Sequence, residues 1–460
     1  MISEKQKIRH LLHRAGLGFT PGEEAVLENK KLSEHIDELF KNSETIEELS
    51  YLPYPLKEGA EAYSTKILLL MLVSITDTQA LSMAWMFRLA TTKAALREQM
   101  TVFWHNHFAT SVPLAYLMQV QNNTIRKNAL GSFRTLAHAI AKDPAMINYL
   151  NNQQNHKNNP NENFARELME LFTIGFGNYT EKDIKESARA FTGWTIDKKG
   201  EYTFRAEDHD DGVKEFRGKS GSFNGEDIIN MLLDDKLTAK FITRKIYKEF
   251  VNEFVDEERI SALAEEFYNS DYDIKKLMKT IFSSEWFYEE KNIGTKIMSP
   301  VELMIRMKKL INLTPKEDLI QVKFQRVLGQ LLLFPPNVAG WKGGRNWIDG
   351  ASLFLRLNLA LASRGKYKIN ASDKPQFEET GEIKPARELL FSAEWSALSQ
   401  LINGETDEQL IQSAAEKLLQ VELTETEKQK FVALLNQSTV ETKKIDALTL
   451  IMSSPSFQLI

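Results

Sequence analysis

Apolar residues recur at three- and four-residue steps along most of the chain, which is the spacing of one face of an α-helix. This spacing predicts helices over residues 3–15, 80–108, 128–150, 162–175 and 179–194. The same pattern resumes at residue 226 and continues nearly to the end of the chain. The predicted fold class is therefore mainly α, with a multi-helical, bundle-like architecture.

Short sequence signals mark where several of these helices begin and end. Gly16 closes the first helix, because glycine is the usual residue just past a helix end. Pro144 breaks the 128–150 pattern, since the residue before a proline is biased away from helical backbone angles. Thr180 is a suitable N-cap for the 179–194 helix, with Asp183 in the capping-box position.

Two stretches depart from helical spacing. Residues 200–225 combine alternation, glycines and acidic residues, which predicts a small irregular or β-hairpin insertion near 200–222. Residues 151–163, "NNQQNHKNNPNEN", form an Asn-rich polar stretch. Such stretches usually lie on the surface, and long ones often carry function.

We divide the chain into three units: a helical core at 1–235, a helical module with a loop and helix at 236–372, and a C-terminal module at 373–460. Residues 373–385 are the best linker candidate. Residues 411–457 echo 241–287, since both show three helical segments that end in Ser-Ser-x-x-Phe. A duplicated module and chance similarity between amphipathic helices both explain this echo.

Charge and composition restrict the function classes. The chain has 460 residues, with 58 basic and 63 acidic side chains and a formal net charge of −5. No nucleic-acid partner is expected, because general nucleic-acid binders carry a basic excess. The absence of cysteine excludes disulfides, thiolate nucleophiles and Cys-ligated metals.

The N-terminal sequence "MISEKQKIRHLLHRAG" is charged and lacks the apolar run of a signal peptide. Residues 67–75, "ILLLMLVSI", are apolar but too few to span a bilayer. The expectation is a cytoplasmic chain without a transmembrane segment, or an exported one if the chain has been trimmed.

The stretch "FWHNHFATS" places His105 and His107 two apart in an apolar setting. In a strand both imidazoles would point to one side, whereas in a helix they diverge by about 200°. Imidazole is the commonest metal ligand and the usual acid/base group. The two residues are therefore candidate ligands or proton carriers, and satisfied structural histidines are the alternative.

The helix at 162–175 carries a polar strip beside its apolar face. At 100° per residue, Asn163, Glu167 and Glu170 fall on one side, with Arg166 next to them. Two carboxylates and a carboxamide can hold a hard cation or an imidazole-bound metal. A solvated face with an ordinary ion pair is the alternative.

Two further motifs carry candidate chemistry. His209 lies among acidic residues in "AEDHDDGVKEFRG", where a neighbouring aspartate can orient an imidazole, and a polar exposed turn is the alternative. In "FPPNVAGWKGGRNW", Trp341 could stack on a flat ligand and Arg345 could assist an anion site built from backbone N–H groups. A glycine loop that lets tryptophan fill the core is the other interpretation, and Trp194 in "FTGW" favours it.

The segments "HLLHRAGLGFTPGE", "FWHNHFATS", "NENFARELMELFTIGFGNYTEKDIKESARAFTGWT", "HDDGVKEFRGKSGSFNGEDII", "FITRKIYKEFV" and "PPNVAGWKGGRNWI" occur in this order. Together they resemble the bacterial family catalogued as domain of unknown function 1800, over nearly the whole chain. The resemblance supplies no reaction. It implies a partner candidate, because members are often encoded beside a second uncharacterised family related to sulfatases, and it implies export for many members.

The leading hypothesis is a metal-dependent or acid/base enzyme, or a ligand-binding relative of one, with a polar pocket in the first half. The proposed catalytic residues are His105, His107, Arg166, Glu167 and His209, and the proposed metal ligands are His105, His107, Glu167 and Glu170. A small polar substrate would contact Asn106, Asn163, Arg189, Trp194, Trp341 and Arg345. The cofactor is unknown, with a divalent metal as the candidate. The alternative is a non-catalytic helical scaffold that binds a partner protein and whose polar cluster is a buried structural network.

Overall fold

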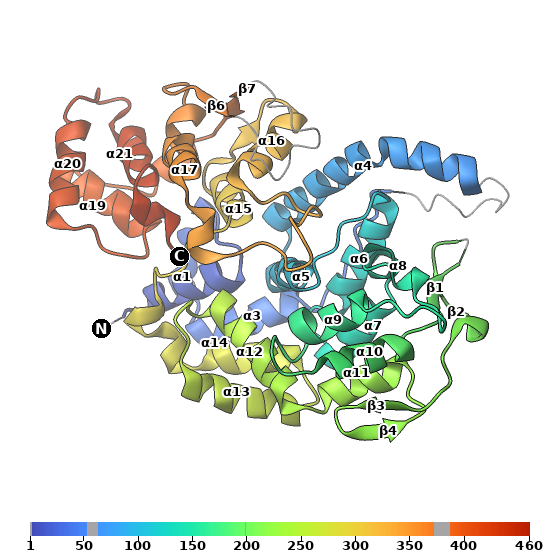
Figure 1. Ribbon diagram of the computed structural model, residues 1–460. Helices are drawn as coiled ribbons and strands as arrows, with labels where there is room; N and C mark the ends of the chain where they lie inside the picture. Colours follow the sequence, from blue (N-terminus) through green and yellow to red (C-terminus); the bar gives the residue numbers. More distant parts are fainter. Residues whose placement is uncertain (1, 53–62, 198, 372–386) are drawn as a thin grey trace.

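The computed structural model describes residues 2–52, 63–197, 199–371 and 387–460, and for residues 63–76, 318, 371 and 387 the backbone alone. Helices make up most of the described chain, so the predicted mainly α class is confirmed (Figure 1). The linker predicted at 373–385 lies outside the described residues. The predicted division into three units remains a prediction.

The first part of the chain supplies most of the short helices. In order these are α1 (Glu4–Ala15), α2 (Pro21–Glu24), η1 (Leu27–Asn29), α3 (Leu32–Asn42), α4 (Tyr63–Thr91), α5 (Ala95–His107), α6 (Ala115–Asn128), α7 (Phe133–Ala141), α8 (Pro144–Tyr149), η3 (Asn152–Gln154), α9 (Asn163–Glu167), the π-helical turn η4 (Leu168–Phe172), α10 (Glu181–Ala190), η5 (Ala206–Asp208) and α11 (Gly225–Leu233).

The second part continues the helical pattern to the C-terminus. Its helices are α12 (Lys236–Phe250), α13 (Glu257–Asn269), α14 (Ile274–Ser283), η6 (Glu285–Tyr288), η7 (Glu290–Asn292), α15 (Pro300–Ile311), α16 (Asp318–Leu328), η8 (Gly344–Trp347), α17 (Gly350–Ser363), α18 (Ser396–Ser399), α19 (Asp407–Leu418), α20 (Glu425–Leu435), α21 (Lys443–Met452) and η10 (Pro455–Gln458). In Figure 1, α19 to α21 gather at one end of the molecule and β1 to β4 at the other.

The strands form small antiparallel pairs. They are β1 (Trp194–Ile196) with β2 (Tyr202–Phe204), β3 (Lys214–Phe216) with β4 (Lys219–Gly221), β5 (Thr314–Pro315) with β8 (Phe391–Ser392), and β6 (Ile369–Ala371) with β7 (Arg387–Leu389). The first two pairs form the insertion predicted near 200–222, which is therefore confirmed.

The helix signals in the sequence work as expected where a capping residue is present. Gly16 caps the end of α1, and Asp143 caps α8 with Pro144 in its first turn. The Thr180 side chain accepts from the backbone N–H of Asp183, whose own side chain accepts from Thr180 in return. Each of the two side-chain N-caps, Asp143 and Thr180, stabilises its helix by about 0.5–2 kcal/mol.

The single helix predicted over 80–108 is wrong, because the chain breaks between α4 and α5. The Thr92 hydroxyl accepts from the backbone N–H of Ala94 at 3.0 Å and so offers the backbone an alternative to the helical ladder. The Asn-rich stretch also departs from expectation, because Asn152 and Asn155 in it are buried. The Asn155 carboxamide donates to the carbonyl of Ala188 and accepts from the N–H of Asn161, which fixes the loop.

Two large clusters of buried apolar side chains hold the molecule together. The first combines α1, α3 and α5 to α14, and the second combines α4 with the helices from α15 onward. Helix α5 contributes to both, with Met100 and Trp104 in the first cluster and Ala95 in the second. Helices α6 and α8 also contribute to both clusters, so the molecule has two cores that share these three helices, and the site described below lies where the cores meet.

The two segments that echo each other have the same order of elements. Helices α12, α13 and α14 lead into η6, and helices α19, α20 and α21 lead into η10. In each 3-10 turn the N–H of the phenylalanine, Phe287 or Phe457, donates to the carbonyl of the second serine. Duplication of the module remains a prediction. Within the described chain, no helix is long and apolar enough to cross a membrane.

Candidate functional site

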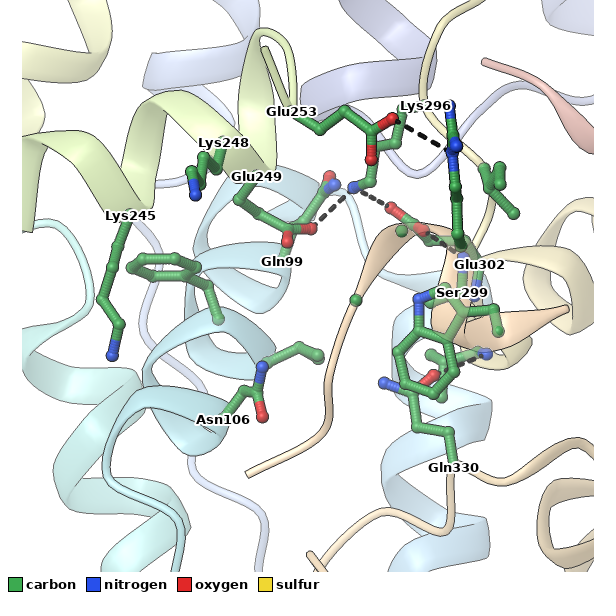
Figure 2. A pocket seen from close by; sticks show the side chains of 18 of the residues that line it. Gln99, Asn106, Lys245, Lys248, Glu249, Glu253, Lys296, Ser299, Glu302 and Gln330 are labelled. Carbon is green, nitrogen blue, oxygen red and sulfur yellow. Dashed lines mark hydrogen bonds and ion pairs between the residues drawn. The ribbon is translucent and has the colours of Figure 1, made fainter. Parts of the chain in front are cut away.

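A cleft of about 640 Å³ opens where the two cores meet (Figure 2). This size lies within the usual range of small-molecule sites. The residues that line it come from α5, from α12 and the turn after it, from the 295–302 segment, and from the loop before α17: Leu17, Gln99, Val102, Phe103, Asn106, Lys245, Lys248, Glu249, Glu253, Phe254, Thr295, Lys296, Ile297, Ser299, Val301, Glu302, Gln330, Gly343, Gly344, Arg345 and Trp347.

One wall of the cleft is a polar face of α12. Lys245, Lys248 and Glu249 are spaced at i, i+3 and i+4 and so point to the same side of the helix. Figure 2 shows all three projecting from this helix. Neither lysine forms an ion pair within the described part of the chain. The wall therefore presents two lysine amines without an ion-pair partner among the described residues.

On the opposite wall, Lys296 and Glu302 form a partly buried ion-pair triad with Glu249 of α12. The amine of Lys296 lies 2.6 Å from an oxygen of Glu249 and 2.7 Å from an oxygen of Glu302, as the dashed lines in Figure 2 mark. Burial would lower the pKa of Lys296, but the two carboxylates outweigh it and raise that pKa above its usual value. Glu302 also caps α15 with Ser299, so the start of that helix fixes its position.

The floor contains an unpartnered amide. Gln99 on α5 is 5% exposed, and neither its Nε2 nor its Oε1 has a hydrogen-bond partner among the described residues. A buried polar group left without a partner costs about 1–3 kcal/mol. In Figure 2, Gln99 lies between the two walls. Among the cleft residues, its amide is the feature that most clearly calls for a bound partner.

The loop "PPNVAGWKGG" covers one side of the cleft and is held by α5. Asn106 Oδ1 accepts from the backbone N–H of Trp341 at 2.7 Å, and its Nδ2 donates to the carbonyl of the same residue at 3.3 Å. The carboxamide thus pairs with the loop backbone as a neighbouring strand would. Gly340 has a φ of +76°, and a Cβ there would lie 2.2 Å from Asn106 Oδ1.

Gly340→Ala is therefore expected to displace this loop. The left-handed backbone alone costs an alanine about 1–2 kcal/mol, and the overlap with Asn106 adds to that cost. Urea denaturation should show a lower free energy of unfolding than in the wild type. Gly343→Ala is the matched control, because Gly343 has no neighbour within 4 Å of its Cβ position and an ordinary φ of −75°. Equal stability of the two variants would contradict this account of the loop.

His105 faces the second core. Its ring lies between Trp85 and Trp341, at centroid distances of 5.4 and 5.6 Å. Its Nε2 accepts from the backbone N–H of Leu333 at 3.2 Å, so the neutral ring carries its hydrogen on Nδ1. Burial lowers the pKa of His105 to about 4. His105 therefore acts as a neutral core residue that fixes the start of the covering loop.

His107 faces the first core. Its Nε2 is 3.1 Å from the carbonyl oxygen of Phe172, which can only accept, so Nε2 carries the hydrogen. Its Nδ1 is then an acceptor, and the amine of Lys245 lies 2.8 Å from it. Burial, together with the charge of Lys245, holds the pKa of His107 well below its usual value. His107 is a neutral histidine that reaches the cleft only through Lys245.

The two imidazoles diverge because α5 stays helical through His107. The predicted metal set of His105, His107, Glu167 and Glu170 is therefore not gathered into one site. Within the described residues, no three His, Asp or Glu side chains lie where they could share a metal ion.

The predicted polar strip on 162–175 changes because the helix widens into the π-turn η4. A π-turn has more residues per turn than an α-helix, so Glu170 leaves the face predicted from 100° steps. The carboxylate of Glu170 bonds instead to the hydroxyl of Tyr179. Burial, and then the charge of Glu170, raises the pKa of Glu167. Arg166 pairs with Glu162 and Glu181 at 3.1 and 3.0 Å.

Four of the remaining predicted residues lie outside the cleft. Arg189 binds both carboxylate oxygens of Asp210, at 2.7 and 3.2 Å. His209 is buried, not exposed as expected, because its Nδ1 donates to the carbonyl of Thr192 at 2.8 Å and its ring packs on Phe204. Trp194 packs in the first core. Asn163 is exposed at the start of α9.

Two of the predicted substrate-binding residues, Asn106 and Arg345, line the cleft. Trp341 does not line it and packs on His105. The residues that sequence reasoning missed are Gln99, Lys245, Glu249, Lys296 and Glu302. The available signal was weak, because Lys245 and Glu249 in "FITRKIYKEFV" show only that α12 has a charged side among its apolar positions.

Comparison with known proteins identifies the family to which this chain belongs. Residues 10–459 match the family model described as a protein of unknown function, DUF1800. The chain belongs to the DUF1800 family. No curated protein and no solved structure matches it. The DUF1800 match includes every residue that lines the cleft, so the site lies wholly inside the family's domain.

Proposed function

We propose that this DUF1800 protein binds a small organic anion in the cleft, one that also carries a neutral group able to donate and accept hydrogen bonds. The observation that carries the proposal is the unpartnered amide of Gln99. A ligand with a carboxamide, or with a hydroxyl beside a carbonyl, would satisfy both its Nε2 and its Oε1.

The charges of the cleft support an anionic ligand. Lys245 and Lys248 face it without a carboxylate partner in the described chain, whereas Lys296 already has Glu249 and Glu302. An anionic group near Lys245 and Lys248 would be attracted by Lys248 and by the protonated form of Lys245, and repelled by the carboxylates of Glu249 and Glu302. The ligand would therefore lie with its charge toward α12 and its neutral part toward Gln99.

The apolar lining supports a ligand with a short carbon skeleton. Trp347 is 8% exposed and Phe103 is half-buried, and both rings line the cleft. Pockets of this kind combine apolar walls with a few placed polar groups that fix ligand orientation. The cleft has this composition, with Gln99 and the lysines of α12 as the orienting groups.

Gln99→Met tests the proposal because it separates binding from stability. The variant should unfold with a free energy about 1–3 kcal/mol above that of the wild type, because an unsatisfied buried amide is removed. It should also lose the ligands that stabilise the wild type in a thermal-shift screen of small organic acids, amines and neutral amides. We expect the wild-type ligands to be acids that carry an amide or a hydroxyl.

Gln119→Met is the matched control. Gln119 is also 5% exposed, but its oxygen accepts from the N–H groups of Tyr51 and Leu52, and its nitrogen donates to the carbonyl of Leu52. This substitution should destabilise the protein and leave the acids bound. Destabilisation of Gln99→Met, a screen dominated by amines, or the absence of any stabilising acid would overturn the proposal.

A further inference from the structure

We infer that Lys245 is a reactive amine that forms an imine with a carbonyl-bearing anion in the cleft. This inference rests on the proposed function and names a substrate class for it, namely small aldehydes or ketones with a carboxylate, such as α-oxo acids. It concerns a covalent step that anion binding alone does not require.

The hydrogen bonds around Lys245 match a neutral amine. Its Nζ lies 2.8 Å from Nδ1 of His107 and 3.3 Å from the carbonyl oxygen of Leu171. Both of these atoms are acceptors, because the bond from His107 Nε2–H to the carbonyl of Phe172 fixes the tautomer of the ring. An –NH₂ group has two hydrogens for these two acceptors and one lone pair left over. An ammonium would carry a third hydrogen, for which the described residues supply no acceptor.

The surroundings of Lys245 favour the uncharged form in other ways. No carboxylate of the described chain lies within ion-pair distance of its amine, although Glu249 is one turn away on the same helix. The π-turn η4 brings the carbonyls of Leu171 and Phe172 to this point, and π-turns frequently lie at functional sites. Burial lowers the pKa of Lys245 to about 8, although the nearby Phe241 ring, 5.0 Å away, favours the charged form.

The proposed step balances without an external oxidant or reductant. The lone pair of Nζ forms a C–N bond to the carbonyl carbon while the C=O π bond breaks. Both N–H hydrogens and the carbonyl oxygen then leave as one water molecule, and a C=N bond remains. The Nδ1 atom of His107 is placed to take a proton from the nitrogen, and Lys248, three residues along α12, faces the ligand carboxylate.

Reductive trapping on the full-length protein tests this inference. Wild-type protein is incubated with glyoxylate and cyanoborohydride, and peptide mass mapping measures carboxymethyl incorporation at every lysine. We expect incorporation at Lys245 to exceed the mean of the exposed lysines by about tenfold, because a lowered lysine pKa raises the free-amine fraction more than it weakens the nucleophile. Incorporation at Lys245 no greater than at exposed lysines would overturn the inference.

Two variants sharpen the result. Lys245→Met should abolish the fast incorporation, whereas Lys240→Met, which removes an exposed lysine on the same helix, should leave it unchanged. The comparison of carboxymethyl incorporation among the lysines of the wild-type protein tests the inference even if Lys245→Met folds poorly. Stabilisation by acids that depends on Gln99, without trapping at Lys245, would overturn only the imine. Absence of both would overturn the proposed anion binding as well.

Discussion

Replacing Glu98 by alanine is expected to lower the free energy of unfolding by about 3–5 kcal/mol, because it leaves a buried charge without its partner. The side chains of Glu98 and Arg126 are 3% and 1% exposed. Arg126 donates to Glu98 through two of its nitrogens, and the indole N–H of Trp85 donates to the same carboxylate at 2.9 Å. In the variant, the Arg126 guanidinium and the Trp85 indole N–H would stay buried and would lose their carboxylate acceptor.

Urea denaturation with a shared m-value measures this effect. Glu285→Ala is the control, because Glu285 also pairs with a cation, Lys7, but its side chain is 88% exposed. Exposed pairs contribute about 0–1 kcal/mol. A loss for Glu98→Ala as small as that for Glu285→Ala would show that Arg126 finds other partners. The double variant Glu98→Leu/Arg126→Met should recover most of the lost stability, since no charge is then buried.

The position of Glu98 explains why its loss matters for the cleft. It links α4, α5 and α6 through Trp85 and Arg126, and the next residue along α5 is Gln99. Seven residues further on, Asn106 holds the covering loop. Helix α5 therefore fixes the floor and one side of the cleft, and the buried ion pair fixes α5.

The predicted helices were recovered well because apolar spacing is a local property that the two cores preserve. Two departures have local causes that no spacing rule detects. The break at Thr92 has neither glycine nor proline, and depends on a side-chain bond to the backbone of Ala94. No particular residue type in the sequence marks the π-turn at Leu168–Phe172, yet this turn moves Glu170 off the predicted face of the helix.

The site was predicted less well because its residues are dispersed. The "FWHNHF" motif is chemically rich, but its histidines bind backbone groups in two different cores, at Leu333 and Phe172. Its asparagine, between them, is the residue that reaches the cleft. Gln99 and Lys296 look in the sequence like ordinary polar positions of amphipathic segments. Only burial and the absence or presence of partners distinguish them. These properties follow from contacts between residues far apart in the chain, such as Asn106 and Trp341, which are 235 positions apart.

Asp143→Asn is expected to stabilise the protein at alkaline pH by up to about 4 kcal/mol. Asp143 is 3% exposed and caps α8, with Oδ1 accepting from Gln121 at 2.9 Å and from the N–H of Met146 at 3.1 Å. Burial raises the pKa of this carboxyl from 3.8 to about 7, because its other oxygen has no partner among the described residues. Asparagine keeps the cap and carries no charge.

The sign follows from the proton count. Between pH 3.8 and about 7 the folded protein holds the Asp143 proton more tightly than the unfolded chain does, so the contribution of Asp143 to the free energy of unfolding falls as pH rises through this window. Above about pH 7 the full penalty for burying the carboxylate is present. The free energy of unfolding of the asparagine variant should therefore rise relative to that of the wild type between pH 4 and pH 8.

The difference between variant and wild type is the quantity to measure, because buried histidines impose the opposite trend on both proteins. Burial lowers the pKa of His105 to about 4, so protonation of the unfolded chain destabilises the fold as pH falls from about 6.5 to 4. Subtracting the urea-derived free energies of the two proteins at each pH cancels this term. A difference that is the same at pH 5 and pH 8 would mean that the Asp143 carboxylate is hydrated in the folded protein. The polar contacts of Gln121 and Asp143 would then form a water-filled site, not a dry part of the core.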